Sequence, residues 1–92
     1  MVPADAAWAS ETHVVVIENI RVNPPAVTAQ RGDRFVWVNK DLVPHTASSA
    51  GPGFDSGNIP SASSWSYVAK QPGSYPYSCA FHPMMHGTLT VR

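Results

Sequence analysis

Short apolar runs separated by prolines and glycines follow one another along the chain, and this pattern is typical of an all-β domain. Four consecutive β-branched side chains, Val14 to Ile17, predict a strand that is covered on both faces. Phe35 and Trp37 alternate with valines, so both rings fall on one face, and we predict that Trp37 is a central core residue. The predicted strands are residues 13–20, 26–30, 35–39, 65–69, 75–79 and 88–91, with one more short strand near Phe54.

The connections between these runs also favour a β-sandwich. Residues 46–64 are rich in Ser, Gly and Pro and predict a long loop, which in a compact domain packs over an edge or serves a site. Residues 71–74, Gln-Pro-Gly-Ser, suit a type II turn, because proline fixes φ at the second position and glycine supplies positive φ at the third. Pro76 predicts an edge or an irregularity in its strand. Six or seven short strands in 92 residues predict a Greek-key sandwich of two sheets.

Length and composition limit the function classes. A chain of 92 residues allows one domain, which we place at residues 13–92 after a flexible tail at residues 1–12. Six Lys and Arg balance six Asp and Glu, which argues against a nucleic-acid-binding surface. No apolar run is long enough to predict a membrane span, and a single cysteine, Cys79, excludes an internal disulfide.

The segment between the last two predicted strands concentrates the candidate chemistry. It carries Cys79, His82 and Met85 at C-x2-H-x2-M spacing. Thiolate and thioether are soft donors, imidazole suits copper in both oxidation states, and two histidines with one cysteine and a weak axial methionine form a blue-copper site. His45, in the loop after the Trp37 strand, is well placed to supply the second imidazole.

Several motifs together resemble those of the cupredoxins, in particular the amicyanin and plastocyanin type. The resemblance covers about residues 14–92 and implies a sandwich of about seven to eight strands with one copper ion at its end. It also implies that the copper ligands are His45, Cys79, His82 and Met85. The matching motifs are Gly32-Asp33, Trp37-Val38-Asn39, Pro44-His45, Pro72-Gly73-Ser74-Tyr75-Pro76-Tyr77-Ser78-Cys79, His82-Pro83, Met85 and Gly87.

The function that the resemblance implies is outer-sphere electron transfer by a small blue copper protein, not catalysis. We expect a monomer that meets redox partner proteins transiently through an apolar surface, and neither nucleic acid nor a membrane span. We also expect a periplasmic location, reached by a signal peptide that this chain does not contain intact. The expected docking surface is formed by Pro44, His82, Pro83 and Met84.

The chain departs from the usual cupredoxin pattern at three places. Thr46 follows the upstream histidine where the family often has asparagine, and it can make fewer hydrogen bonds between the ligand loops. Phe81 stands where amicyanin and plastocyanin usually carry proline. Met84 and His86 flank Met85, so Met84 is an alternative axial thioether.

Three other functions use the same residues. A periplasmic copper carrier or buffer would bind the metal without shuttling electrons, and soft ligands near Met84 would favour its release. A structural zinc site also uses histidine and cysteine. A cysteine hydrolase would need an acid that orients the histidine and an oxyanion site, and we recognise neither in the sequence.

Overall fold

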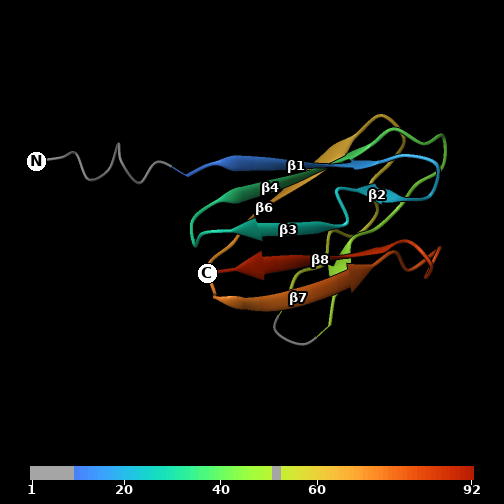
Figure 1. The fold of residues 1–92 in the computed structure, drawn as a ribbon. Helices are drawn as coiled ribbons and strands as arrows, with labels where there is room; N and C mark the ends of the chain where they lie inside the picture. The colour runs from blue at the N-terminus through green and yellow to red at the C-terminus, as the bar shows by residue number, and fades with distance from the viewer. Residues whose placement is uncertain (1–9, 51–52) are drawn as a thin grey trace, which may run out of the picture.

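The computed structural model describes residues 10–50 and 53–92, and its regular structure is entirely β (Figure 1). No helix in these two ranges is long and apolar enough to cross a membrane. The strands are β1 (Thr12–Ile17), β2 (Val22–Asn23), β3 (Ala26–Ala29), β4 (Arg34–Asn39), β5 (Ser48–Ser49), β6 (Ser64–Val68), β7 (Gly73–Ser78) and β8 (His86–Val91).

The strands form two four-stranded sheets that lie face to face (Figure 1). One sheet has the order β2-β1-β4-β6 and the other has the order β3-β8-β7-β5. The pairs β1 with β4 and β3 with β8 are parallel, and the other pairs are antiparallel. Strands distant in the sequence are therefore neighbours, and the Greek-key sandwich predicted from the sequence is confirmed.

Aromatic rings fill the space between the sheets. Trp37 is completely buried, as predicted, and its ring lies 5.2 Å from that of Phe54, 5.4 Å from Trp65 and 5.5 Å from Tyr77, centroid to centroid. Phe35 on the same face of β4 is also completely buried. The alternation in β4 thus places the core on one face of its sheet and supports the strand end that leads to His45.

Two predictions about the strands are wrong. β1 ends at Ile17 because a tight turn follows, and Val14 is 50% exposed, so only one face of this strand is fully covered. The short strand expected near Phe54 lies instead at β5, whose two residues pair with β7. Phe54 itself belongs to the buried core.

The start of β7 also differs from the prediction. Gly73 has a φ of 151°, far from the roughly 80° of a type II turn, and it already belongs to the strand. The Tyr75 hydroxyl closes this corner by donating a hydrogen bond of 2.7 Å to the carbonyl of Gln71. Pro76 lies beyond the pairing with β5, which reaches only Tyr77 and Ser78, so its missing N–H breaks no ladder bond on that side.

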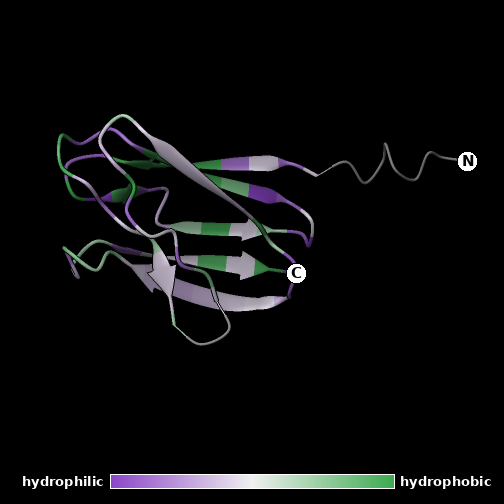
Figure 2. Cartoon of the chain, turned by 180° about the vertical axis from the view of Figure 1, so that it is seen from behind, coloured by the Kyte–Doolittle hydropathy of each residue, from purple (hydrophilic) through white to green (hydrophobic). Residues whose placement is uncertain are grey.

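The strand directions bring two loops together. The loops that follow β4 and β7 lie at the end of the sandwich away from both termini (Figure 1). Figure 2 shows hydrophobic loop segments at this same end. β1 begins at Thr12, so the sheet includes the last residue of the predicted tail, of which residues 1–9 lie outside the described residues.

Candidate metal centre

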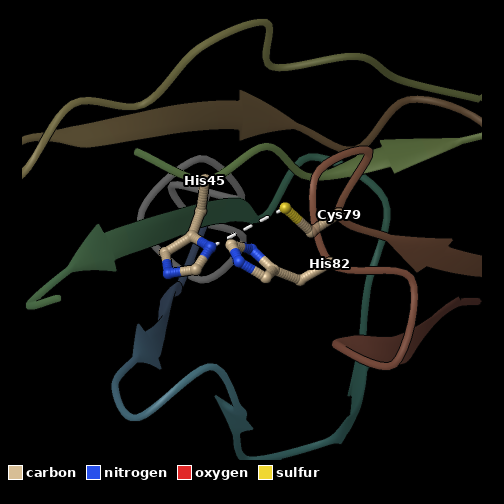
Figure 3. A group of neighbouring side chains, drawn as sticks. All are labelled: His45, Cys79 and His82. Atoms are coloured by element: carbon tan, nitrogen blue, oxygen red, sulfur yellow. Dashed lines mark hydrogen bonds between the residues drawn. The ribbon is translucent and has the colours of Figure 1, made fainter. Parts of the chain in front are cut away.

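Three of the predicted ligand side chains meet between these loops. One nitrogen of His45, the sulfur of Cys79 and one nitrogen of His82 all lie within 4.8 Å of one another (Figure 3). Cys79 Sγ is 3.7 Å from His45 Nδ1, and the two imidazole rings are 5.2 Å apart at an angle of 59°. His45 precedes Cys79 by 34 residues, yet its ring converges on one small volume with the two donors of the downstream loop.

Backbone hydrogen bonds hold the upstream histidine in place. His45 forms an isolated β-bridge with Ile59, in which each residue donates its N–H to the carbonyl of the other, at 3.1 and 2.7 Å. Both side chains are buried. The long loop predicted at residues 46–64 thus serves the site by pairing back onto the histidine that precedes it.

The downstream loop is closed by its own backbone. The N–H of Cys79 donates to the carbonyl of Met85 at 3.0 Å, and the N–H of Met85 donates to the carbonyl of His82 at 2.8 Å. Met85 is 1% exposed, whereas Met84 is 90% exposed and His86 is also on the surface. Burial therefore favours Met85 over Met84 as the axial thioether, which stays a prediction.

Thr46 joins the two loops at the cysteine. Its backbone N–H donates to Cys79 Sγ at 3.3 Å, and its hydroxyl accepts a hydrogen bond from the N–H of Ala80 at 2.8 Å. We expected Thr46 to make fewer contacts than asparagine, and its hydroxyl makes one bond to the opposite loop. This one bond is enough to connect the two ligand segments directly.

The surroundings of Cys79 favour its thiolate form. Burial opposes ionisation, but the hydrogen bond from the Thr46 backbone, with the nearby N–H groups of Phe81 and His82, outweighs it and lowers the pKa of the thiol to about 6. The bond from the Thr46 N–H to the sulfur is 3.3 Å long. At neutral pH the sulfur is a thiolate, which is the form that binds metals.

The outer nitrogen of His45 contacts a carboxylate that we did not predict. His45 Nε2 lies 2.8 Å from Asp41 Oδ2. Burial opposes ionisation of Asp41, but hydrogen bonds from Ile20, His45 and Asn19 outweigh it and hold the pKa of this carboxyl below its usual value. The only sequence signal was an acidic residue four positions before a candidate ligand, which is weak on its own.

The donor set fits a copper ion. His82 Nδ1 is buried and has no hydrogen-bond partner in the described part of the chain, an arrangement that is costly unless another group completes it. A thiolate, two imidazoles with available nitrogens and a buried thioether in the same loop match the donors of a blue-copper site. The structure thus groups His45, Cys79 and His82 as a possible metal site.

The surface around the centre is apolar. Phe81 is 55% exposed and Leu42 is 92% exposed, and both belong to the loops that carry the candidate ligands. The prolines next to the two histidines, Pro44 and Pro83, are also exposed. His82 is partly exposed, whereas His45 and Cys79 are buried, so His82 is the candidate ligand nearest to solvent.

Comparison with known proteins identifies relatives of the whole chain. The cupredoxin-like domain family matches residues 1–91. An amicyanin from Paracoccus versutus is 30% identical over 96 residues, covering 99% of this chain and 68% of the relative. Amicyanin-alpha from Methylorubrum extorquens is 29% identical over 83 residues, covering 85% and 70% of the two chains. The structure of an amicyanin variant in its reduced state superimposes with a TM-score of 0.82 at 25% identity, covering 95% of this chain and 89% of that one.

Proposed function

Because the chain belongs to the cupredoxin-like family, we propose that it is a blue copper protein that shuttles single electrons between redox partner proteins. The observation that carries this proposal is the convergence of His45, Cys79 and His82 within 4.8 Å, with a thiol pKa of about 6. Met85 is proposed as the fourth, axial ligand because it is buried in the same loop. A bound copper ion would supply one-electron chemistry by alternating between Cu(II) and Cu(I).

The protein's own contribution is a ligand set that changes little between the two oxidation states. His45 is fixed by its bridge to Ile59, and Cys79 is fixed to Met85 and Thr46. Side chains that are already held in position need little rearrangement when the charge of the site changes. Since two of the three grouped donors are buried, a substrate has no direct access to them, and we propose an electron carrier and not an enzyme.

The proposed docking surface is the apolar patch formed by Pro44, His82, Pro83 and Met84, to which Phe81 and Leu42 can be added. The chain has only 13% charged residues, so a partner would dock through a small hydrophobic contact. Contacts of this kind are weak and short-lived, as redox encounters require. We propose that the protein acts as a monomer in the periplasm, because an unpaired thiolate with copper suits a compartment outside the cytoplasm.

The test is to add Cu(II) to the metal-free protein and record its visible spectrum and its voltammogram. We expect an intense thiolate-to-copper absorption band and a reversible one-electron wave. Cys79→Ser should abolish the band, whereas His86→Gln, which changes an exposed histidine next to the same loop, should leave it intact. A band that survives in the Cys79 variant would contradict the ligand assignment, and a protein that binds Zn(II) but gives no band with Cu(II) would favour a structural zinc site.

The exposure of Met84 favours a copper carrier as the second candidate. Its thioether is a soft donor on the surface beside His86, where it could receive or release Cu(I). A carrier would lose Cu(I) quickly to a competing chelator, whereas an electron shuttle would retain it through repeated oxidation and reduction. The rate of Cu(I) transfer to a chelator, compared between the wild type and Met84→Leu, separates the two functions.

A further inference from the structure

The turn between β1 and β2 has an unusual backbone. Asn19 and Ile20 both have a φ of 57°, and Glu18 and Arg21 exchange backbone hydrogen bonds of 3.0 and 3.2 Å across them. This is the pattern of a two-residue hairpin with both central residues in the left-handed region, where asparagine and glycine are favoured. A β-branched residue such as Ile20 is an outlier there, and such strain persists only where the surroundings hold it.

The carboxylate of Asp41 holds this turn in place. The N–H of Asn19 donates to Asp41 Oδ1 at 2.6 Å, and the N–H of Ile20 donates to Asp41 Oδ2 at 2.9 Å. Two successive N–H groups that converge on one anion form a backbone nest. The backbone N–H of Asp41 in turn donates to the side-chain oxygen of Asn39 at 2.9 Å, so the backbone that carries the carboxylate is held as well.

The same carboxylate reaches the candidate metal centre through His45. An ionised carboxylate only accepts hydrogen bonds, so the 2.8 Å contact requires the ring hydrogen to be on His45 Nε2. In the neutral ring, which is the form that binds metals, Nδ1 is then unprotonated, and this is the nitrogen that lies 3.7 Å from Cys79 Sγ. A carboxylate on the outer nitrogen also makes the imidazole a stronger donor toward a metal.

We propose that Asp41, held by the left-handed turn at Asn19 and Ile20, is a positioning residue that sets the tautomer of His45 and favours the oxidised form of the copper site. The inference rests on the proposed function, since it assumes that His45 binds copper. The negative charge and the stronger imidazole donor both stabilise Cu(II) more than Cu(I). Both effects therefore lower the reduction potential.

The chain contains a matched control at the opposite end of β4. Asp33 precedes that strand and accepts the same three kinds of hydrogen bond: the N–H of Glu11 at 3.1 Å, the N–H of Gln30 at 3.0 Å and His13 Nε2 at 2.9 Å. The six residues of β4 separate the two carboxylates by about 20 Å along the strand. Asp33→Asn thus makes the same change to the same kinds of hydrogen bond as Asp41→Asn without touching the centre.

The decisive measurement is the reduction potential of the copper-loaded variants at one pH. Asp41→Asn should shift the equilibrium toward the reduced form by about tenfold, which is about 59 mV higher for one electron. Asp33→Asn should leave the potential unchanged. Ile20→Gly keeps both N–H donors and the positive φ, so it should also retain the wild-type potential. An unchanged or lower potential in Asp41→Asn would overturn the proposal.

A second measurement does not depend on copper or on a variant that folds. Nitrogen NMR of the metal-free wild type at neutral pH should show His45 with a hydrogen on Nε2 and none on Nδ1. The opposite tautomer would overturn the proposal even if Asp41→Asn failed to fold. A wild type with this tautomer but without the blue band would contradict the proposed function instead, so the two failures are distinguishable.

Discussion

The hydroxyl of Thr46 accepts a hydrogen bond of 2.8 Å from the backbone N–H of Ala80, and this contact joins the two loops of the candidate metal centre. The neighbouring residues in each loop, His45 and Cys79, are both candidate ligands. The backbone N–H of Thr46 adds a second connection, at 3.3 Å to the cysteine sulfur. One residue therefore fixes both the distance between the loops and the environment of the thiolate.

Removing this hydroxyl should weaken the connection measurably. In Thr46→Val the N–H of Ala80 loses its partner, and we expect the free energy of unfolding of the metal-free protein to fall by about 1 kcal/mol. Thr46→Ser keeps the hydroxyl and is the control, so its free energy of unfolding should be closer to that of the wild type. The measurement is chemical denaturation of the three proteins under one condition. Equal losses in the valine and serine variants would show that the bond contributes nothing to stability.

The two adjacent methionines should differ sharply in their effect on the copper site. Met85 is buried and bonded through its backbone to both Cys79 and His82, whereas Met84 is on the surface. Met85→Leu removes the proposed axial donor. We therefore expect a changed visible spectrum and a higher reduction potential, because the removal of a donor destabilises Cu(II) more than Cu(I). Met84→Leu should leave the spectrum and the potential unchanged. A reversal of these two results would assign the axial position to Met84.

Three of the four candidate ligands could be predicted from the sequence because their signal is local. Cys79, His82 and Met85 lie within seven residues, and donor chemistry at that spacing already indicates copper. The core position of Trp37 was predictable for a similar reason, since alternation along one strand fixes which side chains share a face. Ligand spacing and alternation can both be recognised without knowing which strands are neighbours.

The surroundings of the ligands could not be found in this way. Asp41 receives hydrogen bonds from residues 21 and 22 positions earlier, in a turn whose left-handed backbone no local pattern indicated. β5 is a strand of two residues that exists only because it pairs with Tyr77 and Ser78. Both features depend on tertiary contacts, which override local preference when a segment is short.

Acid should destabilise the metal-free protein partly through Asp33. Burial opposes ionisation of this carboxyl, but hydrogen bonds from His13 and from the backbone of Gln30 and Glu11 outweigh it and lower its pKa in the folded state. The unfolded chain therefore takes up the proton first as the pH falls through about 4, and stability is lost below that pH. We expect Asp33→Asn to lower the free energy of unfolding at neutral pH by about 1–3 kcal/mol and to flatten its decline in acid.

The check on this acid effect is a series of denaturation curves between neutral pH and about pH 3 for the wild type and the variant. Asp55→Asn is the control, because Asp55 also has a lowered pKa through hydrogen bonds from Gly57 and Ser48 but is exposed. Exposed hydrogen bonds contribute less to stability, so Asp55→Asn should change the free energy of unfolding clearly less than Asp33→Asn does. An Asp33 variant whose curve parallels that of the wild type at every pH would exclude this carboxyl as a source of the acid sensitivity.

The backbone N–H of Phe81 is expected to raise the reduction potential, because it lies near the cysteine sulfur and helps to lower the pKa of its thiol. Proline has no N–H, so Phe81→Pro removes this donor while the separate bond from Thr46 remains. A hydrogen bond withdraws electron density from the thiolate, and Cu(II) depends on that density more than Cu(I) does. If about 1.4 kcal/mol of this bond's energy distinguishes the two states, Phe81→Pro should lower the potential by about 60 mV with copper still bound. Phe81→Ala keeps the N–H, so voltammetry should show a reduction potential near that of the wild type. An equal drop in potential in both variants would assign the effect to the lost ring instead.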